Sequence, residues 1–271
     1  MKSVSKALIA RGEHPKLSDW DPRATPGIAD REDAEARLAK NIERIDELQY
    51  SLYAEGERSL LIVLQGMDTS GKDGVIRKVM TAFNPTGTRV TSFKVPTAEE
   101  AAHDFLWRIH HAVPAKGQVG IFNRSHYEDV LVVRVHELVP EKVWSRRFDE
   151  INDFEEHLHV HGTRILKFFL HITRDEQKER LLARLDEPDK HWKFNEGDLA
   201  ERSRWKDYQR AYADVLAKCS TKIAPWYIVP ADRKWYRDFA ISEIVAETLA
   251  EMDPEPPKVR LDVKKLKAAL K

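Results

Sequence analysis

The chain has very little cysteine and no long apolar run, and each absence excludes a class of protein. Its 271 residues include one cysteine, Cys219, so an intrachain disulfide is impossible and a disulfide-stapled secreted fold is excluded. No stretch approaches the ~20 apolar residues of a membrane span. The apolar stretch within residues 1–10 is too short for a signal peptide. We therefore expect a cytoplasmic protein with no membrane partner.

The chain also has no formal net charge at pH 7. Lys plus Arg and Asp plus Glu each total 45, which gives a formal net charge of zero. Such a balance creates no global field for a polyanion, so nucleic acid is not an expected partner. Attraction for phosphate must then come from local clusters, and residues 72–94 hold five cations against one acid. The same cations are also compatible with an ordinary solvated surface.

Five strand-like runs alternate with helical segments, which is typical of a parallel sheet with helices on both faces, an α/β fold. Strands are predicted at 60–65, 89–93, 119–123, 165–172 and 226–229. Helices are predicted at 31–56, 72–82, 98–112, 140–161, 175–186, 199–218 and 235–252. Residues after the carboxyl ends of the strands are the first candidates for a site, because ligands of open α/β sheets bind there.

One catalytic domain, residues 31–252, is expected between two terminal segments. Residues 1–30 hold several prolines and little periodicity, which indicates an irregular arm on the surface. Residues 253–271 contain prolines followed by basic residues. Both an arm in an oligomer and plain disorder are compatible with this tail.

The clearest motif follows the first predicted strand. Gly66, four further residues, Gly71 and Lys72 match the P-loop pattern, in which backbone N–H groups surround phosphate oxygens and the lysine adds a positive charge. The motif lies between a strand and a helix, as it requires, and a turn without a ligand is the alternative. The sequence therefore predicts a phosphate cradle made of Gly66, Met67, Thr69, Ser70, Gly71 and Asp73.

Two carboxylates make this loop unusual. Asp73 stands where a Ser or Thr normally offers its hydroxyl to magnesium. Asp68 would repel phosphate unless a cation lies between them, so we expect Asp68 to bind Mg²⁺, with Mn²⁺ as a second candidate ion. The alternative is a turn residue that bonds its own backbone.

A second polar segment, residues 123–129, follows the third predicted strand. Arg124 can offer a planar fork of donors to phosphate oxygens. Glu128 or Asp129 can hold a hydrated Mg²⁺ ion. A plain ion pair between Arg124 and Glu128 at a helix start is the alternative.

Four segments in this order, at 66–74, 122–129, 191–199 and 224–236, resemble the polyphosphate kinase type 2 family. The resemblance covers roughly residues 17–252. It implies a P-loop kinase fold related to thymidylate kinases, and magnesium-dependent transfer of a terminal phosphoryl group between inorganic polyphosphate and a nucleotide. Family members commonly form dimers or tetramers, so a homodimer or homotetramer is expected.

Two departures refine the resemblance. Many members carry Asp where this chain has Asn123, and Gly where it has Asp73. The departures resemble the subgroup that phosphorylates both AMP and ADP. They leave open which carboxylate partners Asp68 at the metal. Adenine nucleotides are the implied partners, with guanine nucleotides as a further candidate.

The resemblance also implies roles for individual residues. Asp68, Lys72, Arg124 and Asp129 would be catalytic, and Asp68, Glu128 and Asp129 would hold metal. Residues 184–206 would form a mobile lid, although their mixed charges also fit a solvated helical hairpin. Within the lid, Arg184 and Lys193 would touch phosphate and Asp198 would recognise the base. A cationic path for polyphosphate would use Arg77, Lys78, Arg134 and Arg202.

Two other functions compete with this interpretation. An ATP-dependent nucleoside monophosphate kinase would share the fold, but Asp73 replaces the hydroxyl residue that such enzymes carry. A non-catalytic protein that binds nucleotide or polyphosphate would not need Asp68, Lys72 and Arg124 together.

Overall fold

The computed structural model describes residues 3–10 and 15–270. Residues 1–2 and 11–14 of the predicted N-terminal arm, and Lys271 of the predicted tail, lie outside the described residues.

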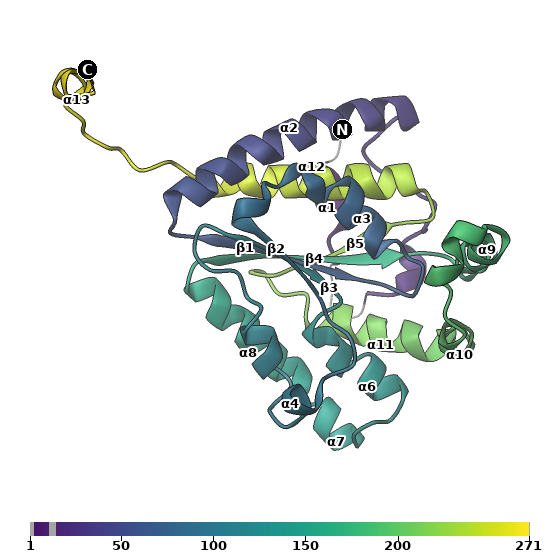
Figure 1. Cartoon of the computed structure of the whole chain (residues 1–271). Helices are drawn as coiled ribbons and strands as arrows, with labels where there is room; N and C mark the ends of the chain where they lie inside the picture. Colours follow the sequence, from purple (N-terminus) through teal and green to yellow (C-terminus); the bar gives the residue numbers. More distant parts are fainter. Residues whose placement is uncertain (1–2, 11–14, 271) are drawn as a thin grey trace.

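A five-stranded parallel sheet forms the centre of the molecule (Figure 1). Its strands are β1 (Ser59–Gln65), β2 (Thr88–Ser92), β3 (Val119–Asn123), β4 (Thr163–His171) and β5 (Trp226–Pro230). Their order is β2-β3-β1-β4-β5, so β1 is the central strand. Every residue of β1 and β5 is buried, as expected where helices cover both faces. All the predicted strands and the α/β class are confirmed.

Two layers of helices enclose the sheet (Figure 1). One layer contains α2 (Arg31–Glu55), α3 (Lys72–Lys78) and α12 (Lys234–Met252), and the other contains α8 (Arg147–Val160) and α11 (Trp205–Lys218). None of the helices within residues 3–10 and 15–270 is both long and apolar enough to cross a bilayer.

The long helix α2 begins and ends where its sequence predicts. The Asp30 carboxylate accepts a hydrogen bond from the backbone N–H of Asp33, which caps the first turn. Gly56 then ends the helix in the left-handed conformation, with φ of 68°.

Three of the predicted helices are each divided into two shorter helices in the structure. Residues 98–112 form α4 (Ala98–Ala101) and α5 (Trp107–His110), because the Asp104 carboxylate accepts from the backbone N–H of Leu106 and closes a turn between them. Residues 140–161 form α7 (Glu141–Trp144) and α8. Residues 199–218 form α10 (Gly197–Ser203) and α11, and the predicted helix at 72–82 ends early at Lys78. Apolar spacing continues across such short turns, so it does not reveal them.

The N-terminal segment is more regular than predicted. Residues Val4–Leu8 form the helix α1, and Val4 and Leu8 are buried. Ile9 pairs with Tyr227 as an antiparallel bridge, and Ala10 donates its N–H to the carbonyl of Trp226 at 2.8 Å. The segment thus covers the outer edge of β5, which would otherwise present unpaired backbone groups.

A buried polar network joins β4 to the segment that follows β3. The Lys167 ammonium donates to Glu155 Oε2 at 2.5 Å, to the Tyr127 hydroxyl at 2.8 Å and to the Cys219 carbonyl at 2.7 Å. His126 contacts Glu155 Oε1 at 3.3 Å. Burial by itself would raise the pKa of Glu155, but the Lys167 charge holds that pKa below its ordinary value.

We predict that Lys167→Met destabilises the fold by about 3–5 kcal/mol, because it leaves the Glu155 charge buried and unpaired. The measurement is the free energy of unfolding in urea. The double variant Lys167→Met/Glu155→Leu serves as the control, and it should recover a large part of the loss. A double variant that is less stable than the single one would contradict this account.

Candidate active site

The loop at residues 66–71 joins β1 to α3 and depends on two glycines. Gly66 and Gly71 have positive φ values of 153° and 105°. A Cβ atom at Gly66 would lie 2.7 Å from Ser70 Oγ, and one at Gly71 would lie 1.9 Å from Arg237 Nη1. No other residue type fits either position without displacing its neighbours.

Helix α9 (Arg174–Asp186) holds this loop by its backbone carbonyls. Gln177 Nε2 donates to the Asp68 carbonyl at 3.1 Å. Arg180 Nη1 donates to the carbonyls of Thr69 and Ser70 at 2.9 and 3.0 Å. In a planar trans peptide the N–H points opposite to the carbonyl, so the N–H groups of Thr69 and Gly71 turn away from α9. Both residues line the cleft described below.

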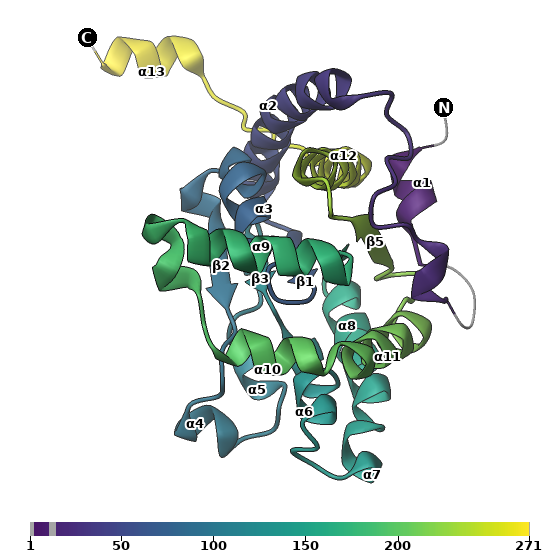
Figure 2. The same cartoon turned by 90° about the vertical axis from the view of Figure 1, so that its right-hand side faces the viewer.

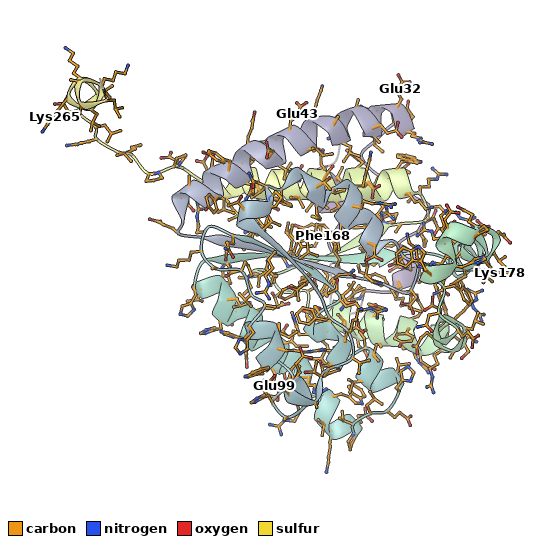
Figure 3. The ribbon with its side chains drawn as sticks, in the orientation of Figure 1. Glu32, Glu43, Glu99, Phe168, Lys178 and Lys265 are labelled. Carbon is orange, nitrogen blue, oxygen red and sulfur yellow. The ribbon has the colours of Figure 1, made fainter. Side chains whose placement is uncertain are left out.

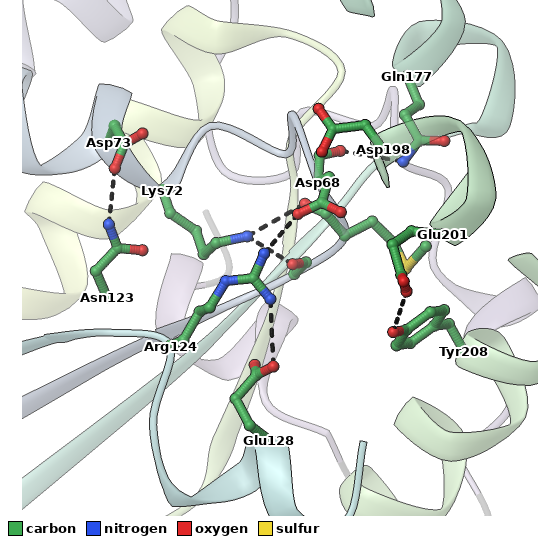
Figure 4. Close-up of polar contacts among 12 residues, drawn as sticks. Asp68, Lys72, Asp73, Asn123, Arg124, Glu128, Gln177, Asp198, Glu201 and Tyr208 are labelled. Atoms are coloured by element: carbon green, nitrogen blue, oxygen red, sulfur yellow. Dashed lines mark hydrogen bonds and ion pairs between the residues drawn. The ribbon is translucent and has the colours of Figure 1, made fainter. Parts of the chain in front are cut away.

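Lys72 lies directly over the loop (Figure 4). Its ammonium donates to the carbonyls of Gly66 and Met67 at 2.7 and 3.2 Å. The pKa of Lys72 is lowered to about 8, mainly by burial and in addition by the nearby Arg124 charge. The lysine is therefore a positive charge placed in a low-dielectric position at the loop.

This shift predicts a pH dependence. Lys72 loses its charge as the pH rises through about 8, so kcat/KM should decline above that pH. The measurement is kcat/KM between pH 6 and 10. Lys94→Ala, which removes another lysine of the cleft, should keep the same decline. A flat profile up to pH 9.5 would contradict the assignment.

Arg124 is held in a strained backbone conformation at the end of β3. Its φ is 64°, and its N–H donates to the Leu64 carbonyl of β1 at 3.0 Å. The guanidinium bridges two carboxylates, Asp68 at 2.6 Å and Glu128 at 3.2 Å (Figure 4). Glu128 is the main reason that the pKa of Arg124 lies well above its ordinary value, and Asp68 adds to it. The P-loop and the polar segment after β3 are thus joined by the ion pair between Asp68 and Arg124.

Asp68, Lys72 and Arg124 line a cleft of about 800 Å³. Its walls carry far more positive than negative side chains, as expected for a site that binds a polyanion. The cations are Lys72, Arg77, Lys78, Lys94, Arg124, Arg180, Arg184, Lys190, Lys193, Lys234 and Arg237, and the acids are Asp68, Asp73, Asp198 and Asp238.

The predicted lid borders this cleft. Helices α9 and α10 lie one above the other on the side of the molecule that faces the viewer in Figure 2. Arg184 of α9 donates to the Lys193 carbonyl at 3.0 Å and to the Asp198 carboxylate at 3.1 Å. Burial raises the pKa of Asp198, and the negative charge of Asp68 adds to that shift. Arg184, Lys193 and Asp198 all line the cleft. Contact of Arg184 and Lys193 with phosphate, and of Asp198 with the base, stays a prediction.

A second lid contact lies below the loop. Glu201 of α10 accepts a hydrogen bond from the Tyr208 hydroxyl (Figure 4). Its carboxylate also contacts the His136 ring. These contacts tie α10 to the segment after β3 and to α11.

Loop residues divide between the cleft and the interior. Asp68, Thr69, Gly71 and Asp73 line the cleft, and the Asp73 carboxylate accepts from Asn123 Nδ2 at 2.7 Å. Met67 and Ser70 are buried beneath it, as is the 66–67 backbone that holds Lys72. Part of the predicted phosphate cradle therefore faces the cleft, and the other part is buried and supports the loop.

Four residues predicted to hold metal or polyphosphate do not line the cleft. One is Glu128, whose carboxylate pairs with Arg124 at 3.2 Å. The Asp129 carboxylate is bound to Arg147 at 2.9 Å and does not line the cleft, so a metal shared with Asp68 does not fit this arrangement. Arg134 pairs with Asp214 at 2.6 Å and lies over the Trp144 ring, away from the cleft. Arg202 donates to the Arg174 carbonyl and to Gln177, so it braces the lid rather than a polyphosphate path. Adjacent acids and cations in a sequence do not reveal which of them face a common cleft.

Two cleft residues, Lys234 and Arg237, were not predicted. They follow β5 at the start of α12. Arg237 is 3% exposed and pairs with Asp238 through Nε and Nη2, which directs Nη1 toward Gly71. Their position after the carboxyl end of a strand was the signal that could have identified them.

The residues present fit a magnesium ion that arrives with phosphates. Within residues 3–10 and 15–270, no group of three or more His, Cys, Asp or Glu side chains is arranged to hold a metal alone. Mg²⁺ in nucleotide enzymes usually takes one or two carboxylates and completes its shell with phosphates and water. Asp68, whose carboxylate is 21% exposed, supplies such a ligand, and Glu128 lies on the other side of Arg124.

Comparisons with known proteins agree with this geometry. The sequence model described as Polyphosphate kinase 2 (PPK2) matches residues 28–257, which include every residue that lines the cleft. The chain therefore belongs to the polyphosphate kinase 2 family. The resemblance identified from the four sequence segments is confirmed.

Individual relatives of this family match over almost the whole chain. The AMP/ADP-polyphosphate phosphotransferase of Meiothermus ruber is 50% identical over 90% of this chain and 91% of its own. The ADP-polyphosphate phosphotransferase of Rhodopseudomonas palustris is 44% identical over 95% and 94%. The crystal structure of polyphosphate kinase 2 from Arthrobacter aurescens superposes with a TM-score of 0.96 at 46% identity, covering 99% of this chain and 96% of that one.

Proposed function

We propose that this chain is a kinase that transfers the terminal phosphoryl group of inorganic polyphosphate to AMP and ADP, reversibly and with magnesium. The observation that best supports this proposal is the cleft. It is lined by the P-loop lysine, by Arg124 and by many further cations. A long polyanion needs such an open cationic surface, whereas a single nucleotide does not. Family membership and the names of the relatives support the same activity.

Phosphoryl transfer asks the protein mainly to position two phosphates and to stabilise charge on the oxygens between them. Lys72 and the N–H groups of Thr69 and Gly71 would hold the phosphate at the transfer point. Arg124 would hold the phosphate of the second substrate, since its planar fork is fixed by Asp68 and Glu128. A nucleotide phosphate is already an anion, so no strong general base is required.

Asp68 is the residue proposed to hold Mg²⁺, with Mn²⁺ as a substitute, and Glu128 is the nearest second carboxylate across Arg124. Bound there, the ion would neutralise charge on the phosphate oxygens. Asp129 is not included, because its carboxylate is bound to Arg147 of α8 rather than to Arg124 and does not line the cleft.

Acceptance of both AMP and ADP is proposed from the pair Asp73 and Asn123, which hydrogen-bond to each other at the mouth of the loop. The M. ruber relative, named for both nucleotides, supports this range. Guanine nucleotides, a homodimeric or homotetrameric assembly and a cytoplasmic location remain predictions from the sequence.

The experiment incubates the purified chain and Mg²⁺ with either polyphosphate or ATP as donor, and with either AMP or ADP as acceptor. ADP and ATP are then separated by chromatography. Polyphosphate should yield ADP and ATP from AMP, and ATP from ADP. Product from ADP alone would overturn only the dual-acceptor proposal. ADP formed from AMP with ATP, but never with polyphosphate, would identify an ordinary nucleoside monophosphate kinase.

A further inference from the structure

The C-terminal arm, defined as residues 256–270, extends away from the body of the molecule (Figures 1 and 2). Every residue of the arm is exposed. Its helix α13 (Val263–Ala269) is capped from within the arm, since the Asp262 carboxylate accepts from the Lys265 N–H at 3.0 Å. The arm is therefore ordered as a helix without packing on its own domain.

Such a helix needs a surface to cover it. Val263, Leu266 and Leu270 lie on one face and are 51%, 47% and 87% exposed. Isolated helices shorter than about 12–15 residues are only marginally stable in water, and α13 has seven residues. Burial of its apolar face is what would make this helix stable.

The linker directs the arm away from its own chain. Pro254 is buried and fixes the start of the linker, whereas Pro256 and Pro257 are exposed. Prolines lock their own φ and bias the preceding residue to extended backbone, so this stretch resists folding back. Fully extended, the residues from Asp253 to Asp262 span about 33 Å. The covering surface is thus within reach on a neighbouring molecule.

The charge of the arm points to an acidic surface. The arm carries Lys258, Arg260, Lys264, Lys265 and Lys267 against the single acid Asp262.

Such an acidic surface is present on the second half of α2. Its outward side carries exposed Glu43, Asp46 and Glu47, with Arg44 as the one exposed cation of that half, followed by Tyr50 and Tyr53, which are 65% and 46% exposed. In Figure 3, Glu43 projects from α2 away from the sheet, and Lys265 lies on the detached helix.

We propose that α13 docks on the outer face of α2 in a second copy of this chain, and that the second copy returns the same contact. Leu266 and its apolar neighbours would cover Tyr50 and Tyr53, while the arm lysines would face the α2 acids. The arm leaves the body beside the C-terminal end of α2, because Arg58 Nη1, just beyond α2, donates to the Met252 carbonyl at 2.6 Å. Two chains can therefore exchange arms around one two-fold axis.

The first test measures the mass of the full chain by light scattering after size exclusion. Val263→Asp/Leu266→Asp should lower the mass of the assembly by at least half, with kcat per chain unchanged. Ala268→Asp adds one negative charge on the opposite face of α13, and it should keep the wild-type mass. An unchanged mass for the double variant would overturn the proposal.

The second test identifies the receiving face. Cys219 is buried, so an introduced surface cysteine is the reactive one. Chains with Leu266→Cys are mixed with chains that carry Tyr50→Cys, and a disulfide between the two chains should form. Val160→Cys, exposed on α8 in the other helical layer, is the control and should not cross-link. Absence of the Leu266–Tyr50 cross-link would overturn the proposal.

A membrane is the competing occupant for a basic amphipathic helix. If wild-type chain binds vesicles of anionic phospholipid, and Val263→Asp/Leu266→Asp abolishes that binding without changing the mass, the arm is a membrane contact and the proposal fails.

Discussion

Asp68→Asn should lower kcat by about 10³-fold while the fold is retained, because the change removes only the charge of one oxygen donor. The backbone carbonyl of residue 68 still accepts from Gln177, so the loop should keep its shape. What is lost is the carboxylate that faces the cleft and pairs with Arg124. The measurement is steady-state transfer from polyphosphate to ADP across a range of Mg²⁺ concentrations.

The concentration of Mg²⁺ required for half-maximal activity should also rise in this variant. Asp73→Asn is the matched control, since Asp73 lines the same cleft but is bound to Asn123. It should cost less than about 10-fold, because an amide can keep that hydrogen bond. Equal losses in the two variants would show that Asp68 has no special role at the metal.

Lys72→Ala should lower kcat/KM by about 10³-fold or more, since it removes the buried charge at the phosphate loop. Arginine should not replace it well, because Lys72 is 8% exposed and its ammonium fits between two loop carbonyls. Steady-state kinetics with polyphosphate and ADP give the measurement, and circular dichroism checks that the fold is intact.

Lys78→Ala is the control for Lys72→Ala. Lys78 ends the same helix and lines the same cleft, but it lies outside the loop. Its loss should weaken polyphosphate binding by less than about 10-fold, and added salt should reproduce the effect because the contact is a screened surface charge. Near-normal activity of Lys72→Ala would mean that the transfer point lies elsewhere.

Local patterns predicted the parts of the structure that depend on local physics. The apolar run at 60–65 and the glycines at 66 and 71 indicated a strand and a tight loop, and both are present with positive φ at the glycines. The alternation of strand-like and helical runs predicted the five strands, and the spacing of apolar residues with the final Gly56 predicted the helix α2.

Side-chain partners across the molecule could not be predicted in this way. Asp129 follows Glu128 directly, yet the two side chains diverge, one to Arg147 of α8 and the other to Arg124. Arg180 lies before the predicted lid at 184–206 and belongs to none of the motifs, although it holds two loop carbonyls. These pairings depend on how distant helices pack, which spacing along the chain does not encode.

The central claim is that the chain transfers phosphoryl groups from polyphosphate to ADP, and ³¹P NMR tests it most directly. Full-length chain, Mg²⁺, polyphosphate and ADP are observed together by ³¹P NMR, with Lys72→Ala run in parallel. The account predicts that the γ-phosphorus signal of ATP grows in step with the loss of polyphosphate phosphorus, and that free phosphate stays constant. Growth of free phosphate without ATP, or ATP formation that is unchanged in Lys72→Ala, would contradict it.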